Sequence, residues 1–268
     1  MSRDICIYLE FLTDAHKQTI CAAAQAAGFT PHFFTLDQFD EARACVQNCE
    51  VLFAHSPELL RAAPASLQWY CCSFAGADPY CKNDGIFANP DCMLTNSNSY
   101  GVTIAEHVVM VTLMLLRRMP EYAQVMQRRG WSNQLSVRSI RGSHFTLLGT
   151  GDIGTTFARK LRALGAASIT GVNRSGRCPD EVYDRVVPIS DLDTVLPDAH
   201  VLVMSLPSTP ETVGILSRAR LELLPRDAFV INVGRGSAID QDALIEALNT
   251  ERIAGAALDV MVPEPLPQ

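Results

Sequence analysis

The sequence predicts an α/β fold of two doubly wound parallel-sheet lobes, and three observations lead to this class. Short apolar runs rich in β-branched and aromatic residues alternate with helical periods along almost the whole chain. These runs form two series, which one long helical stretch separates near residue 100. A glycine-rich turn follows the first strand of the second series. Such alternation is typical of parallel sheets with helices on both faces.

The first lobe is predicted from five apolar runs and two helical periods. The expected strands are Ile5–Leu9, His32–Thr35, Val51–Ala54, Trp69–Ser73 and Met93–Asn96. The expected helices lie near Asp14–Ala27 and Asp37–Cys45.

The second lobe begins with a long helix, roughly Val102 to Arg118, followed by a helix at Glu121–Arg129. The recurrence of apolar residues at three- and four-residue spacing predicts one packing stripe on the long helix. Its positions are Val102, Ala105, Val109, Leu113 and Leu116. The expected strands are Phe145–Leu148, Ser168–Val172, Val201–Ser205, Ala228–Asn232 and Ile253–Leu258.

Composition indicates an ordinary globular protein: 48% of the 268 residues are hydrophobic and 19% are charged. The net charge of −7 argues against nucleic acid as a partner, because phosphate backbones require a basic surface. No signal peptide or membrane span is apparent, so we expect a cytoplasmic protein without a membrane partner. The nine cysteines lack zinc-ligand spacing; we expect small buried residues and no metal site.

The segment Gly149-Thr150-Gly151-Asp152-Ile153-Gly154 follows an apolar strand and opens an amphipathic helix. In a dinucleotide fold the first glycine permits the turn, the second admits a pyrophosphate, and the third packs the helix on the strand. The alternative is an ordinary glycine-rich turn. The flanking pattern favours a dinucleotide site that includes Asp152 and Ile153.

The end of the next strand indicates which dinucleotide is bound. Folds that bind NAD carry an acid there, roughly 20 residues after the glycine turn. Here the strand ends in Asn173-Arg174-Ser175, without an acid. A guanidinium and a hydroxyl suit a 2′-phosphate, so we predict NADP(H) in preference to NAD(H). Alternatively, Arg174 is a solvated loop residue.

Several linked motifs resemble the D-isomer-specific 2-hydroxyacid dehydrogenase family, in particular its glyoxylate/hydroxypyruvate reductases. The resemblance covers nearly the whole chain and is strongest from Asn96 onward. Besides the glycine turn it rests on four segments. These are Ile104–His107, Ser205–Thr212, Asn232–Gly236 and Leu258–Pro265.

The resemblance implies a flavodoxin-like substrate domain at residues 1–100 and a Rossmann dinucleotide-binding domain at 101–268. It implies an NAD(P)-dependent oxidoreductase that reduces small 2-keto acids to D-2-hydroxy acids and forms a homodimer. Arg235 corresponds to the catalytic arginine that binds the substrate, and Glu264 to the acid that orients a catalytic histidine. The alternatives are a structural salt-bridge arginine and a surface acid. Implied cofactor contacts also come from Leu206, Pro207, Thr212, Val233 and Asp259.

In the first lobe, Ser73–Asp78 corresponds to the family's substrate loop. The resemblance implies that backbone amides around Ala75 and Gly76 hold the substrate carboxylate, since glycine allows close approach. Phe74 either narrows the pocket or packs in the core of the lobe.

The resemblance places the proton donor on a histidine downstream of Glu264, whereas the sequence ends at Gln268. We therefore expect a truncated or partly represented chain whose substrate domain lacks its returning C-terminal helix. A second hypothesis is an NADP(H)-binding sensor or corepressor-like protein that performs no turnover on the same fold. A third is an enzyme that acts on an inorganic or one-carbon substrate.

Overall fold

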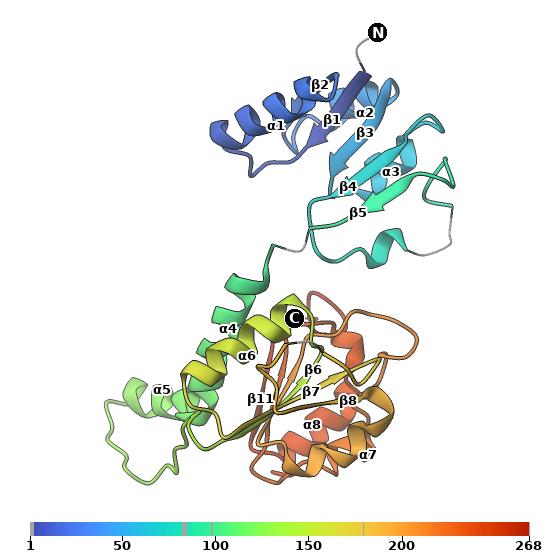
Figure 1. Ribbon diagram of the computed structural model, residues 1–268. Coiled ribbons are helices and arrows are strands. Elements are labelled where there is room, and N and C mark those ends of the chain that lie inside the picture. Colours follow the sequence, from blue (N-terminus) through green and yellow to red (C-terminus); the bar gives the residue numbers. More distant parts are fainter. Residues whose placement is uncertain (1–2, 82–84, 98, 179, 268) are drawn as a thin grey trace. The chain divides into compact units, whose positions relative to one another are not determined.

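The computed structural model describes residues 3–81, 85–97, 99–178 and 180–267 and divides the chain into two compact units, Met1–Ser99 and Tyr100–Gln268 (Figure 1). Each unit contains one sheet whose strand pairs are all parallel. In the described part of the chain, no helix has the length and apolarity to cross a bilayer.

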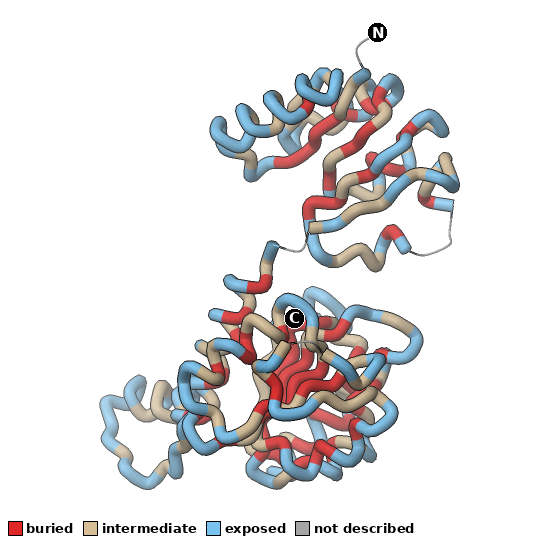
Figure 2. The backbone as a smooth tube through the Cα atoms, in the orientation of Figure 1, coloured by how far each residue is buried: buried red, intermediate tan, exposed pale blue. Residues whose placement is uncertain are grey.

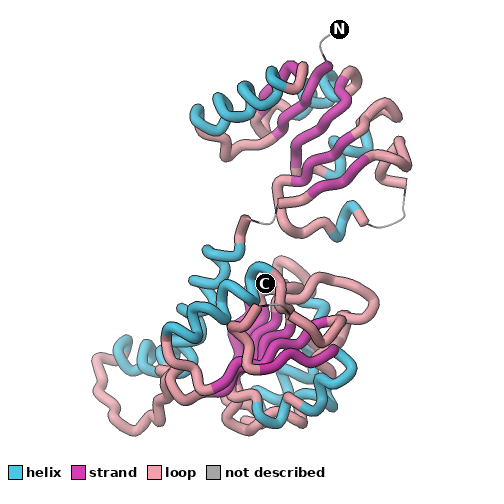
Figure 3. The backbone as a smooth tube through the Cα atoms, viewed as in Figure 1, coloured by secondary structure: helices cyan, strands magenta, loops and turns pink. Residues whose placement is uncertain are grey.

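The sheet of the first unit has five strands in the order β2-β1-β3-β4-β5 (Figure 3). This is the flavodoxin-like order, in which the direction of winding reverses between β1 and β3. The strands are β1 (Arg3–Tyr8), β2 (Phe29–Phe34), β3 (Cys49–Ala54), β4 (Trp69–Cys72) and β5 (Met93–Thr95).

Two helices of the first unit begin where a hydroxyl side chain accepts from a free amide of the first turn. The Thr13 hydroxyl accepts from the His16 amide at the start of α1 (Asp14–Ala26). The Ser56 hydroxyl accepts from the Leu59 amide at the start of α3 (Pro57–Ala62). The remaining helices are α2 (Phe39–Val46) and the 3₁₀ helix η1 (Asp78–Tyr80).

The sheet of the second unit has six strands in the order β11-β10-β9-β6-β7-β8. Counted within this unit the order is 6-5-4-1-2-3, which is the Rossmann arrangement with its switch point between β6 and β9. The strands are β6 (His144–Leu148), β7 (Ser168–Asn173), β8 (Arg185–Pro188), β9 (Val201–Met204), β10 (Phe229–Asn232) and β11 (Gly255–Leu258).

The central strands of this sheet are buried (Figure 2), and two hydrophobic clusters cover its two faces. Alternate residues of β9 belong to each cluster. Val201 and Val203 pack in the cluster that includes residues of α4 and α6, whereas Leu202 and Met204 pack with α7 and α8. Every residue of β9 and β10 is therefore buried, as expected for central parallel strands. The helices are α4 (Gly101–Leu116), α5 (Met119–Gln127), α6 (Asp152–Ala163), α7 (Arg218–Leu221) and α8 (Gln241–Asn249), with 3₁₀ helices η2 (Ile189–Thr194), η3 (Leu196–Asp198) and η4 (Gly236–Ala238).

The stripe predicted on α4 is wrong in part. Ala105 and Leu116 are buried, but Val102 and Leu113 are 57% and 39% exposed. The buried face instead runs through Gly101, Ala105, Val108, Thr112 and Leu116. Because apolar residues occur on almost all sides of this helix, their spacing alone did not identify the side that packs on the sheet.

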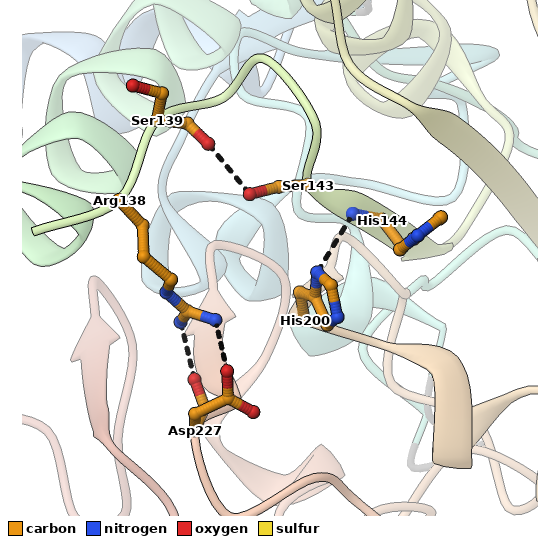
Figure 4. Close-up of polar contacts among 6 residues, drawn as sticks. All are labelled: Arg138, Ser139, Ser143, His144, His200 and Asp227. Carbon is orange, nitrogen blue, oxygen red and sulfur yellow. Dashed lines mark hydrogen bonds and ion pairs between the residues drawn. The ribbon is translucent and has the colours of Figure 1, made fainter.

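A polar cluster joins the segment before β6 to the amino ends of β9 and β10 (Figure 4). Arg138 donates to Asp227 Oδ2 at 2.7 Å and to its carbonyl oxygen, and its guanidinium carbon lies 4.9 Å from the Phe229 ring centroid. Beside this pair, the backbone N–H of His144 donates to Nδ1 of His200 at 3.3 Å. Burial, assisted by the neighbouring His144, lowers the pKa of His200. This cluster fixes the edge of the sheet opposite the glycine turn.

Candidate active site

The loops after β6, β7, β9, β10 and β11 emerge at one edge of the second sheet, because all six strands are parallel. This carboxyl edge is where open α/β sheets bind ligands. In the second unit, the residues predicted to contact the cofactor or to react lie in these five loops, at the end of β7 or at the beginning of α6.

The three glycines of the turn after β6 each have a different environment. Gly149 has a φ of 108°, a left-handed conformation that side chains disfavour. A Cβ at Gly154 would lie 2.0 Å from the Gly149 carbonyl oxygen, so the third glycine permits close packing of α6 on the turn. A Cβ at Gly151 would meet no described atom within 4 Å. The backbone at the second glycine is therefore open to a ligand, which is what a pyrophosphate requires.

The amino end of α6 suits an anion. Gly151 immediately precedes the helix and contributes no side-chain cap. Free amides at the positive end of a helix dipole attract phosphate. Ile153 is half-buried and packs with the α4–α6 cluster. The Asp152 side chain lies against Gly101 of α4. Its carboxylate therefore lies beside the first turn of α4.

Asn173, at the end of β7, stabilises the predicted phosphate loop through hydrogen bonds. Its Oδ1 accepts from the amides of Ser175 and Gly176 at 3.0 and 2.8 Å. Its Nδ2 donates at 2.8 Å to Thr150 Oγ1, which ties the loop to the glycine turn. Asn173 is thus engaged in the loop, whereas Arg174 and Ser175 are exposed beside it.

The positive charge of Arg174 acts on the loop after β9. The pKa of the Glu211 carboxyl lies below its ordinary value because Thr209 hydrogen-bonds to it and, to a smaller extent, because the Arg174 guanidinium is positive. In the same loop, Thr212 Oγ1 donates to the Pro207 carbonyl oxygen at 2.6 Å. This bond fixes the loop just beyond Leu206.

The loop after β9 lies between the glycine turn and the loop that carries Arg235. A Cβ at Gly149 would lie 2.8 Å from Ser205 Oγ, and a Cβ at Gly234 would lie 2.6 Å from the Leu206 carbonyl oxygen. Two glycines therefore bring these three loops into direct contact. Val233 is buried beside Gly234.

Asn232 holds the backbone of Arg235, a role that the sequence alone did not indicate. Its side chain is fully buried; Oδ1 accepts from the Gly234 amide at 3.0 Å and Nδ2 donates to the Arg235 carbonyl oxygen at 2.9 Å. The Arg235 guanidinium donates to the Gly234 carbonyl oxygen at 2.8 Å and is partly buried. In the sequence, the only sign of this role was a side-chain amide at the end of an otherwise apolar strand.

The loop after β11 packs on the loop of Arg235. A Cβ at Gly236 would lie 2.3 Å from the Met261 carbonyl oxygen. Glu264 Oε1 accepts from the Met261 amide at 2.7 Å, so this carboxylate is turned back toward its own loop. Asp259 is exposed, and its amide donates to the Asn232 carbonyl oxygen at 3.0 Å.

In the first unit, the predicted substrate loop follows β4. Asn96 Nδ2 donates to the Ala75 carbonyl oxygen at 2.7 Å, and the Ser97 amide donates to that of Phe74 at 3.3 Å. Ala75 is exposed and Gly76 is partly exposed. Phe74 is 44% exposed, so it does not belong to the core of its unit.

Comparisons with known proteins agree with this geometry. Residues 109–268 match the family model for the D-isomer specific 2-hydroxyacid dehydrogenase, NAD binding domain. The chain is 32% identical over 170 residues to a glyoxylate reductase/hydroxypyruvate reductase of Mus musculus, covering 61% of this chain and 51% of that protein. It is 27% identical over 258 residues to glyoxylate/hydroxypyruvate reductase B of Serratia proteamaculans, covering 89% and 76%.

Solved structures resemble the chain over nearly its whole length. A D-isomer specific 2-hydroxyacid dehydrogenase family protein from Aeromonas salmonicida has a TM-score of 0.84 at 30% identity, covering 100% of this chain and 84% of that one. An NADPH-dependent glyoxylate/hydroxypyruvate reductase from Sinorhizobium meliloti, in complex with NADP and sulfate, has a TM-score of 0.81 at 26% identity, covering 99% and 83%. Against several curated relatives, however, the chain spans only about half of their length, for example 51% of a glycerate dehydrogenase of Methylorubrum extorquens.

Proposed function

Because the chain belongs to the D-isomer specific 2-hydroxyacid dehydrogenase family, we propose that it transfers a hydride between NADP(H) and a small 2-keto or 2-hydroxy acid, with D specificity. Glyoxylate and hydroxypyruvate are the proposed 2-keto acids. The observation that carries this proposal is the contact of three loops at one sheet edge. Gly149 packs on Ser205, and Gly234 packs on Leu206, so a phosphate-binding turn and Arg235 flank the same short loop.

The cofactor site fits a dinucleotide in two respects. The open backbone at Gly151 and the free amides of α6 suit a pyrophosphate. The exposed Arg174 and Ser175 suit a 2′-phosphate, because a guanidinium binds phosphate bidentately. Of the remaining proposed contacts, Asp259 would fix the carboxamide, while Leu206, Pro207, Thr212 and Val233 line the bound molecule. When bound, this cofactor supplies the hydride.

Arg235 is the side chain proposed to bind the keto acid. A fixed cation attracts the substrate carboxylate and polarises the adjacent carbonyl as negative charge develops on its oxygen. Asn232 holds the backbone of this arginine, which limits the positions that its guanidinium can take before substrate arrives. In the first unit, the amides of Ala75 and Gly76 are the proposed second binding site for the carboxylate.

Glu264 is proposed to orient the histidine that donates the proton in this family. A carboxylate beside an imidazole stabilises the imidazolium and raises its pKa, which suits a general acid near neutral pH. Glu264 would have to exchange its bond to the Met261 amide for this role.

A homodimer through the second unit is proposed from an exposed apolar face. Met110, Leu113, Met114, Met119 and Met126 are all at least 39% exposed on α4 and α5, and Trp131 beyond them is 92% exposed. Large exposed apolar side chains on neighbouring helices are typical of an interface. Light scattering of the full-length protein would test the dimer.

The full-length protein should oxidise NADPH in the presence of glyoxylate or hydroxypyruvate, and the absorbance of NADPH measures this rate. Arg235→Ala should remove most of the turnover while NADPH still binds, as followed by its fluorescence. Retained turnover in this variant contradicts the role of Arg235. A wild type that binds NADPH without reducing any 2-keto acid would instead be an NADP(H)-binding sensor.

A further inference from the structure

His55 lies next to the proposed substrate loop although it is distant from it in sequence. It is the first residue after β3, and Ala54 of that strand pairs with Cys72 at the end of β4. Because the two strands are parallel neighbours, the chain beyond each emerges at the same carboxyl edge. His55 therefore stands beside the residues that follow β4, which form the loop.

The His55 ring contacts both ends of this loop. Its centroid lies 4.3 Å from that of Phe74, which precedes Ala75 and Gly76. Its Nδ1 lies 3.2 Å from the hydroxyl of Tyr80, in the short helix η1 that follows them. The same nitrogen lies 3.6 Å from Cys72 Sγ at the end of β4. One imidazole thus connects the strand end, the start of the loop and the helix after it.

Tyr80 gives the imidazole a fixed anchor. Its side chain is only 3% exposed, and its ring lies 4.9 Å from that of Tyr70, which is fully buried. Packed aromatic rings of this kind hold one orientation. A hydrogen bond with such an anchor restricts the imidazole, which in turn restricts Phe74.

The opposite side of the loop is held through its carbonyl oxygens, which leaves its amides available. Asn96 and Ser97 donate to the carbonyl oxygens of Ala75 and Phe74. Among the described residues, the amides of Ala75 and Gly76 donate no hydrogen bond. Amides held in one orientation at an accessible loop bind a carboxylate at a smaller entropic cost than amides of a mobile loop.

We propose that His55 is a positioning residue of the substrate loop: by bridging Phe74 and Tyr80, its ring holds the amides of Ala75 and Gly76 ready for the carboxylate of a 2-keto acid. The inference rests on the proposed function and adds a residue outside the loop to it. Partial burial lowers the pKa of His55, which favours the neutral ring; the ring acts through packing and one hydrogen bond.

Three variants of the full-length protein separate the two contacts. His55→Ala removes both, His55→Phe keeps a ring against Phe74, and Tyr80→Phe keeps the buried ring but removes the hydroxyl. His16→Ala serves as the control, since it changes a histidine of the same unit at the start of α1. Each variant is measured for KM and kcat with glyoxylate, for NADPH affinity, and for calorimetric binding of oxalate, an unreactive analogue of glyoxylate.

His55→Ala should raise the KM for glyoxylate and the Kd for oxalate about tenfold, the size expected for one hydrogen bond and one ring contact. The kcat and the NADPH affinity should stay near those of wild type. His55→Phe and Tyr80→Phe should each show part of the effect, and His16→Ala none. These two partial variants keep the test open if His55→Ala does not fold.

Unchanged KM and oxalate affinity in folded His55→Ala overturn the inference, as does an equal loss of kcat and NADPH affinity. Failure of the proposed function looks different. In that case wild type does not reduce glyoxylate. The oxalate titration then still measures whether His55→Ala binds the carboxylate more weakly than wild type does.

Discussion

The carboxylate of Asp152 lies directly against the α-carbon of Gly101: a Cβ at Gly101 would come within 2.2 Å of Asp152 Oδ2. Gly101 begins α4 and Asp152 begins α6, so the first turns of the two helices touch. Tyr100 supplies no side-chain cap to α4, and the first turn of α4 contains no acid. Asp152 therefore brings a negative charge to the positive end of the α4 dipole from another helix.

Gly101→Ala should destabilise the second unit because its methyl group requires the Asp152 carboxylate to move. Overpacking of this kind costs about 1–3 kcal/mol. Denaturant unfolding of wild type, Gly101→Ala, Asp152→Ala and the double variant measures the effect. The penalty of Gly101→Ala should largely vanish in the Asp152→Ala background. An equal penalty in both backgrounds would contradict the proposed cause.

Arg174→Asp should reverse the cofactor preference. The aspartate repels a 2′-phosphate and accepts hydrogen bonds from a ribose hydroxyl, so kcat/KM should fall with NADPH and rise with NADH. One charge-assisted contact corresponds to about 1.5–3 kcal/mol, or roughly a 10- to 150-fold change. Arg177→Asp is a matched control in the same loop. A wild type that already prefers NADH would contradict the assignment of Arg174 to the 2′-phosphate.

Asn232→Ala should lower both stability and activity. The change leaves the Gly234 amide and the Arg235 carbonyl oxygen without their buried partner, at a cost of about 1–3 kcal/mol. The kcat should fall while NADPH binding persists, since Arg235 loses its support. Asn249→Ala, at the exposed end of α8, is the control. Wild-type stability and kcat in Asn232→Ala would show that the amide does not position Arg235.

Stability should fall with decreasing pH because of His200. Burial lowers the pKa of this imidazole in the folded protein, so the unfolded chain binds more protons just below the ordinary value of about 6.5. Its contribution is therefore complete above that value and is lost as the pH falls through the folded pKa. Four charged or titratable neighbours also act on the pKa of His200. His144 and Arg138 lower it further, whereas Asp227 and Asp198 raise it.

His200→Asn provides the check, because its Oδ1 can accept from the His144 amide as Nδ1 does. The unfolding free energy of wild type should fall more steeply than that of the variant as the pH is lowered from 7. Parallel curves for the two proteins would exclude His200 as the titrating group.

The sequence allowed much of the fold to be predicted because buried parallel strands have a strong local pattern. The expected strand Val201–Ser205 corresponds to β9, in which every residue is buried. The edge strand β8, Arg185–Pro188, was missed because it is short and largely half-buried, begins with a charged residue and ends with a proline. Helix α3 was missed as well, although Ser56 and Pro57 are typical of a helix start.

The candidate site was less predictable. The glycine turn is local in sequence, and its geometry meets the requirements stated for each glycine. Asp152 was assigned to the cofactor, and only the packing of α4 on α6 reveals its proximity to Gly101. His55 and Phe74 are separated by 18 intervening residues and meet because β3 pairs with β4. Such contacts depend on strand order, which no single segment specifies.

The distance between the two edges of the second sheet has a practical consequence for combining substitutions. Strands of four to six residues separate the cluster at Arg138 and His200 from the loops at Arg174 and Arg235 by roughly 13–20 Å, at about 3.3 Å per residue. Effects of changes this far apart are usually additive. Arg174→Asp and His200→Asn should therefore combine without interference, so that cofactor choice and tolerance of acid can be adjusted one at a time.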